Sequence, residues 1–267
     1  MNRRGLLLGL AAGLLTAFLA LPVATLVGRA LGSGALAGAI GSAVVREALG
    51  LSLVTTAASL AITILVGTPL AFLLARRRFP GASIVEVVID LPLVLPPSVA
   101  GLALLLVFGR RGLLGESLDA AGLAIPFTAI AVVLAQVFVA APFYVRAARA
   151  GIASVPRDLE DAARVDGASE PGVFRHVMVP LASPALAAGL VMSWARSLGE
   201  FGATILFAGN VAGRTQTLPL VVYAEFGAGD LDAAIAAATV LVLAALGVLV
   251  AVRLGRRDRA LDLASAV

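Results

Sequence analysis

Six long apolar stretches, separated by short loops that carry arginine, constrain this chain more than any other feature of its sequence. A helix needs about 20 mostly apolar residues to cross the hydrocarbon core of a bilayer. The stretches have that length and lack the alternation typical of barrel strands. They are Gly5–Val27, Leu51–Ala75, Ile84–Phe108, Pro126–Val145, Leu181–Phe207 and Leu231–Val252. We therefore expect an all-α membrane protein with six transmembrane helices.

The composition agrees with this interpretation and excludes several kinds of site. The chain is 60% apolar and 13% charged, whereas soluble domains are roughly 45–50% apolar and about 25% charged. It has no cysteine and a single histidine, His176, so a disulfide, a cysteine cluster and a multi-histidine metal site are excluded. It also lacks the G-x-x-x-x-G-K-[ST] phosphate loop, so we expect no cofactor in this chain. The net charge of +4 does not indicate a nucleic-acid partner, because the arginines lie at the predicted membrane edges.

The distribution of arginine predicts the orientation of the chain. Cytoplasmic loops of membrane proteins carry an excess of basic residues. One set of loops holds 14 of the 20 arginines, the other set holds 5, and Arg196 lies inside a span. We expect the 14-arginine side to be cytoplasmic, which places both the N- and the C-terminus in the cytoplasm. Arg3 and Arg4 before the first apolar stretch are also compatible with a cleaved signal peptide, which would leave five spans without inverting the rest.

The spacing of the stretches divides the chain into three parts. Residues 1–50 form an N-terminal transmembrane helix and an external loop. Residues 51–256 form a transmembrane core, whose longest cytoplasmic loop runs from about 146 to 180. Residues 257–267 form a cytoplasmic tail.

The long cytoplasmic loop is polar, is rich in both signs of charge, and is predicted to hold two short helices at a sharp angle. Ser154 or Asp158 can cap the first helix. Gly167 suits the left-handed position that ends a helix. Ser169 can cap the second helix, and Pro180 marks the return to the membrane. A compact knob with charged and apolar side chains fits docking to another protein.

This loop resembles the cytoplasmic loop of ABC importer permeases, which has the pattern E-A-A, three residues, G, nine residues, I-x-L-P. Here Asp161-Ala162-Ala163 is followed by three residues, Gly167, nine residues and Val177-Met178-Val179-Pro180. The spacing matches in full, and the three departures keep charge or apolar character. The resemblance implies a type I ABC importer permease fold, in which this loop is the coupling helix that docks on an ATPase subunit. The coupling residues it implies are Glu160, Asp161, Ala162, Ala163, Gly167, Phe174, Arg175 and Pro180.

Prolines and charges inside the apolar stretches suggest where a translocation path lies. Pro92, Pro96 and Pro97 each remove a backbone donor, and irregular backbone at membrane depth is tolerated where it meets protein or water. The alternative is a packing kink without substrate contact. Arg196 and Glu200 lie four residues apart, so they either form an intrahelical pair or attract an anion into the path. The pathway or gate candidates are Asp90, Pro92, Pro96, Pro97, Arg196 and Glu200.

Two further runs resemble one branch of the importer family. G-E-F-G-A-T at 199–204, followed by F-A-G-N at 207–210 and G-R-T-Q-T-L-P-L at 213–220, is similar to molybdate/tungstate permeases. Sulfate/thiosulfate permeases share a similar first run, so a sulfate importer stays open as a second interpretation. The polar residues expected to contact an external partner are Arg214, Thr215, Gln216 and Thr217.

The resemblance implies a transport subunit of the cell inner membrane rather than an enzyme. It would move molybdate or tungstate by ATP-driven alternating access. Its implied partners are a second copy of itself, two ABC ATPase subunits that bind ATP and magnesium, an external binding protein, the oxyanion and membrane lipid. The sequence also leaves open an ion-coupled secondary transporter and a membrane-embedded enzyme, although we find no clear internal repeat and no nucleophile–base or metal motif.

Overall fold

A computed structural model describes residues 3–265, and all regular elements in this range are helical. The elements in chain order are α1 (Arg3–Gly32), α2 (Ala35–Gly41), α3 (Ala43–Arg76), α4 (Ala82–Val94), α5 (Pro97–Phe108), α6 (Gly115–Ala120), α7 (Ala129–Ala153), α8 (Arg157–Val165), α9 (Glu170–Val173), the π-turn η1 (Phe174–Met178), α10 (Val179–Leu198), α11 (Gly202–Phe207), α12 (Leu218–Gly227) and α13 (Leu231–Ser265).

Four of the six predicted spans correspond to single helices long and apolar enough to cross a membrane. The predicted span Leu181–Phe207 is such a helix only as far as Leu198, because residues 202–207 form the separate helix α11. The predicted span Ile84–Phe108 forms two helices, α4 and α5, bent by 119°. Leu95 and Pro96 adopt extended backbone at the bend. A proline removes a backbone donor and disfavours helical backbone in the residue before it, so the adjacent prolines Pro96 and Pro97 end α4 and let α5 start in a new direction.

Three predicted boundaries are wrong. Helix α7 runs to Ala153, well past the predicted end at Val145. The second helix of the loop is not separate, because α9, η1 and α10 are continuous from Glu170 to Leu198. No break occurs at Pro180, since the wider π-turn just before it accommodates the missing donor. The predicted tail 257–267 likewise begins inside α13.

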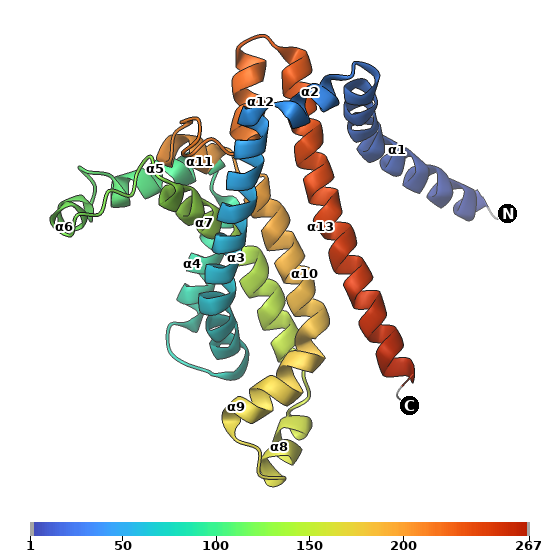
Figure 1. Cartoon of the computed structure of the whole chain (residues 1–267). Helices are drawn as coiled ribbons and strands as arrows, with labels where there is room; N and C mark the ends of the chain where they lie inside the picture. The colour runs from blue at the N-terminus through green and yellow to red at the C-terminus, as the bar shows by residue number, and fades with distance from the viewer. Residues whose placement is uncertain (1–2, 266–267) are drawn as a thin grey trace.

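Helices α3, α7 and α10 form the centre of the bundle, with α8 and α9 at one end and α2 and α12 at the other (Figure 1). Small residues let α7 and α10 approach closely. A Cβ added at Gly151 would lie 2.5 Å from Ala185 Cβ, and one at Gly189 would lie 2.7 Å from Ala147 Cβ. The close crossing of α7 and α10 therefore depends on these glycines.

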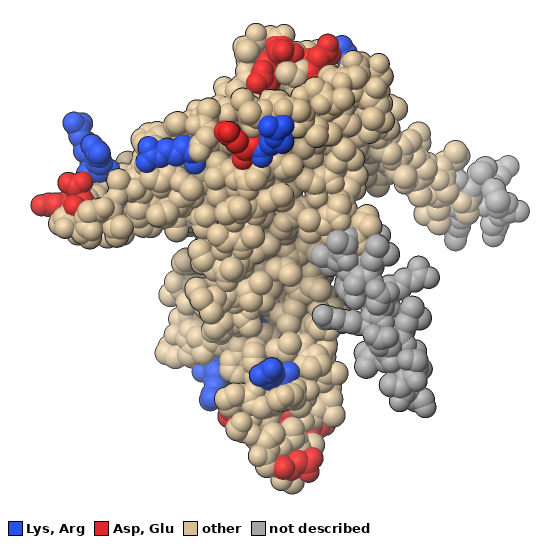
Figure 2. Space-filling model, viewed as in Figure 1, with Lys and Arg blue, Asp and Glu red and all other residues tan. Residues whose placement is uncertain are grey.

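Charged side chains gather near the two ends of the bundle and on the arm around α6 (Figure 2). On the face shown, the surface between them is a band without charged residues. Such a band suits the hydrocarbon core of a bilayer. The α8–α9 loop lies beyond this band at one end of the molecule.

Candidate functional site

The loop between α7 and α10 forms a compact knuckle, which we call the α8–α9 loop (residues 154–178). Helix α8 ends at Val165 and is followed by Asp166 and by Gly167, whose φ is +89°. Gly167 N donates to Arg164 O at 3.0 Å, and Ala168 N donates to Ala163 O at 2.9 Å. These two bonds form a Schellman motif, which satisfies the last carbonyls of the helix. The predicted left-handed position at Gly167 is confirmed.

The predicted side-chain caps of this loop are wrong. The residue before α8 is Pro156, and no side chain caps the helix. Ser154 Oγ donates to Gly151 O at 2.8 Å at the end of α7. Asp158 lies in the first turn of α8, where the helix dipole favours an acidic residue. Ser169 precedes α9 but its side chain makes no cap bond.

Two residues expected at the docking surface instead hold the loop to the transmembrane bundle. Glu160 is only 4% exposed and forms an ion pair with Arg76 at the end of α3. Phe174 is partly buried, and its ring packs edge-to-face on Phe72 of α3, with the ring centroids 5.7 Å apart. The expectation that Glu160 contacts a partner directly is therefore corrected. The other expected coupling residues are exposed or partly exposed: Asp161, Ala162, Ala163, Gly167, Arg175 and Pro180.

Arg164 fixes the shape of the knuckle. Its guanidinium lies 2.7 Å from Asp161 Oδ1, 2.7 Å from Glu170 Oε1 and 3.5 Å from Glu160 Oε2. The hydrogen bond to Glu170 is the main reason that the pKa of Arg164 is raised above its ordinary value. One cation thus joins α8 to the start of α9, so the loop presents its exposed residues on a defined surface.

A second candidate region lies where two interrupted spans meet. Helix α5 begins just after the proline bend, and it packs on α11, which follows the break after α10. A Cβ added at Gly101 would lie 2.6 Å from Ala203 O, and one at Gly202 would lie 2.7 Å from Pro97 Cβ. The proline run and the G-E-F-G-A-T run, far apart in sequence, therefore form one contact.

Glu200 lies at this break and is 1% exposed. Its Oε1 accepts a hydrogen bond from Ala203 N at 2.7 Å, at the start of α11. Its Oε2 lies 2.5 Å from Arg196 Nη1. The predicted pair between Arg196 and Glu200 is confirmed, but it is not intrahelical, because α10 ends at Leu198 and Glu200 lies in the break that follows. The carboxylate of Glu200 also satisfies a donor that the first turn of α11 leaves free.

The acidic residues of α4 pair with α7. Glu86 Oε1 lies 2.8 Å from Arg149 Nη2, and Asp90 Oδ1 lies 3.6 Å from Arg146 Nε. All four side chains are at least one-third exposed. Pro92, half a turn beyond Asp90, lines an apolar cavity between α3, α4 and α7. Asp90 therefore attaches α4 to α7, and with Glu86, Arg146 and Arg149 it lines a small charged cavity between these helices.

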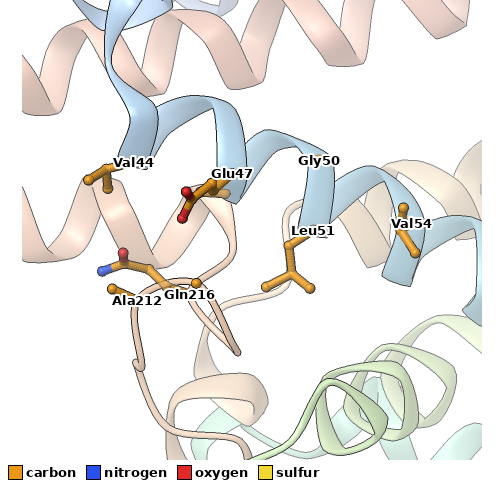
Figure 3. Close-up of a pocket in the computed structure, with 9 residues that line it drawn as sticks. Val44, Glu47, Gly50, Leu51, Val54, Ala212 and Gln216 are labelled. Atoms are coloured by element: carbon orange, nitrogen blue, oxygen red, sulfur yellow. The ribbon is translucent and has the colours of Figure 1, made fainter.

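The four residues expected to contact an external partner differ in how exposed they are. Thr215 and Thr217 are buried, and Thr215 Oγ1 accepts from Val211 N at 3.0 Å, so the expectation that their side chains face a partner is corrected. Arg214 is exposed. Gln216 and Glu47 of α3 line a cavity of about 300 Å³ between α3 and the segment 208–217 (Figure 3).

A polar seam that the sequence analysis missed crosses the centre of the bundle. Gln136 of α7 is 2% exposed, and its Nε2 lies 3.3 Å from Thr56 Oγ1 of α3 and 3.2 Å from Ser197 O of α10. Ser59 Oγ donates to Ser197 Oγ at 3.2 Å. The available signal was the run of serines and threonines spaced three or four apart from Ser52 to Thr63, which marks one face of α3. Such bonds hold helices together in lipid.

Comparisons with known proteins agree with this geometry. The family model described as "Binding-protein-dependent transport system inner membrane component" matches residues 67–260. The molybdenum transport system permease protein ModB of Mycobacterium tuberculosis is 46% identical over 200 residues, which is 75% of each chain. The sulfate transport system permease protein CysT of Salmonella typhimurium is 37% identical over 196 residues, 72% of this chain and 71% of that protein.

Among solved structures, a bacterial ABC transporter involved in the import of the acidic polysaccharide alginate has a chain that superposes with a TM-score of 0.76. The match covers 96% of each chain at 17% identity, so it shows a shared fold. Fold, family model and relatives lead to the same result. This chain belongs to the family of binding-protein-dependent transport system inner membrane components, the multi-pass permease subunits of ABC importers.

Proposed function

We propose that this chain is the inner-membrane permease subunit of an ABC importer for molybdate, and for tungstate by the same path. Its identity to a molybdenum permease, 46%, exceeds its identity to a sulfate permease, 37%, over similar lengths. The G-E-F-G-A-T run, which resembles both molybdate and sulfate permeases, packs on the proline bend of α4 and α5. A region of broken helices is where such a chain offers backbone groups to a polar substrate.

The observation that carries the transport mechanism is the α8–α9 loop at one end of the bundle, where Arg164 joins α8 to the start of α9. ATP and magnesium bind to a partner ATPase, because this chain contains no phosphate loop. Closure of the ATPase pair moves the docked loop, and the helices change between two packings that open to opposite sides. The exposed residues Asp161, Ala162, Gly167 and Arg175 form the docking surface in this proposal.

The assembly follows from the number of loops. The chain has one α8–α9 loop, so a pair of ATPases requires a second permease chain, which in this proposal is another copy of the same chain. The external binding protein meets the opposite end of the bundle, where Arg214 and Gln216 are available.

Uptake by the complex reconstituted in vesicles tests this function. We expect labelled molybdate to accumulate only when ATP and the external binding protein are present. Excess unlabelled tungstate should suppress the signal and excess sulfate should not. Equal competition by sulfate would support a sulfate importer, and accumulation driven by an ion gradient without ATP would support a secondary transporter.

Replacing Gly167 with valine is expected to weaken binding of the ATPase subunit. No atom lies within 4 Å of a Cβ added there, so the cost comes from the backbone, whose φ is +89°. A left-handed backbone costs a residue with a Cβ roughly 1–2 kcal/mol, and a β-branched residue is more strained still. Copurification of the ATPase with the tagged permease measures the effect. Gly167→Asn is the matched control, because asparagine tolerates this conformation; equal copurification with both variants would contradict the role of the turn.

A further inference from the structure

We propose that Arg76, at the end of α3, is a positioning residue that transmits movement of the α8–α9 loop to α3. This inference rests on the proposed function, because it assigns a mechanical route within the same importer. The loop is already continuous with α7 and α10, so these helices provide the obvious route. The structure adds a third helix, which reaches the loop only through side chains.

The connection between Arg76 and the α8–α9 loop is buried and consists of two contacts, an ion pair and a hydrogen bond. The side chains of Arg76 and Glu160 form an ion pair and are 9% and 6% exposed. Arg76 Nη2 also donates to Val155 O at 2.9 Å, just before α8. The guanidinium therefore holds both the backbone that enters the knuckle and the first turn of its helix. A buried charge without its partner is costly, so the pair resists separation.

A second contact, close to the Arg76–Glu160 ion pair, also joins α3 to the α8–α9 loop. Phe72 lies one turn before Arg76 on α3 and packs edge-to-face on Phe174. Arg76 and Phe72 thus contact both parts of the α8–α9 loop, the part before Gly167 and the part after it. A rigid-body displacement of the knuckle must therefore displace the end of α3 or break both contacts.

Helix α3 is suited to carry that displacement to the other end of the molecule. Its 34 residues span about 51 Å. Along its length Ser59 bonds to Ser197 of α10. Near its other end Ser52 Oγ accepts from Leu218 N at 2.8 Å, at the start of α12. Movement at Arg76 thus reaches the segment that follows the G-E-F-G-A-T run.

The test compares Arg76→Met, Glu160→Met and the double variant in the complete reconstituted importer. Three quantities are measured for each: ATPase copurified with the permease, ATP hydrolysed, and molybdate accumulated per ATP. Arg157→Met is the control, because Arg157 is an exposed arginine in the first turn of α8. The double variant removes both buried charges, a change that folded proteins often tolerate when a single removal is damaging.

We expect Arg76→Met to retain the ATPase and its hydrolysis, while molybdate accumulated per ATP falls at least about fivefold. In Glu160→Met and in the double variant, molybdate accumulated per ATP should fall by a similar factor, since all three variants lack the same ion pair. Arg157→Met should keep the wild-type ratio. The inference is overturned if Arg76→Met keeps the wild-type ratio. It is also overturned if the double variant regains that ratio, which would make the pair a folding element only. Failure of the proposed function is seen separately, as absence of ATP-dependent molybdate uptake by the unmodified importer.

Discussion

Replacing Gly101 with valine is expected to lower the thermal unfolding temperature of the purified permease and to abolish uptake. A Cβ at Gly101 would lie 2.6 Å from Ala203 O and 2.8 Å from Ala203 Cα, and both atoms belong to the backbone of α11. Neither can rotate away, so α11 must move off α5. Overpacking of this kind costs about 3 kcal/mol, which corresponds to a shift of roughly 6–12 °C in a domain of this size.

Gly247→Val is the matched control for this prediction. Gly247 lies in the apolar helix α13, and no atom lies within 4 Å of a Cβ added there. The control variant should unfold within about 2 °C of the unmodified protein, because only a small propensity change remains. If Gly101→Val unfolds at the same temperature as this control and still transports, the close packing of α5 on α11 is not essential.

The sequence predicted those features that depend on local physics. Apolar length predicted the spans, since a helix is the simplest way to satisfy backbone groups in lipid. Spacing around Gly167 predicted the turn of the knuckle, because only a residue without a Cβ adopts that backbone freely. The four-residue spacing of Arg196 and Glu200 predicted their contact.

Features that depend on distant parts of the chain were not predictable in the same way. The prolines indicated a disturbed helix but could not give the 119° bend, because its direction depends on how α5 packs on α11. Glu160 resembles an exposed acid of a docking loop, and only its partner Arg76, 84 positions earlier, shows that it is buried. Thr215 and Thr217 misled for the same reason, since burial in a turn depends on what packs around it; the Thr215 hydroxyl is buried where it accepts from Val211 N of its own turn.

Replacing Arg196 with methionine is expected to destabilise the permease by about 3–5 kcal/mol, because it leaves the carboxylate of Glu200 buried without its cation. Glu200 is 1% exposed, so water cannot replace the lost partner. Thermal unfolding of the purified variant measures this loss. The double variant Arg196→Met with Glu200→Gln should recover most of it, because the amide oxygen can still accept from Ala203 N while the buried charge is gone.

The same double variant separates the two roles open to Arg196. If the arginine serves only to neutralise Glu200, the double variant regains molybdate uptake together with stability. That is the expected result, because the side chain of Arg196 is 29% exposed and its Nη1 lies 2.5 Å from the carboxylate. A double variant that is stable and binds its ATPase but transports no molybdate would show instead that the guanidinium acts on the anion. The break between α10 and α11 would then be an anion site as well as a structural junction, because transport would require the positive charge of Arg196 even though folding would not.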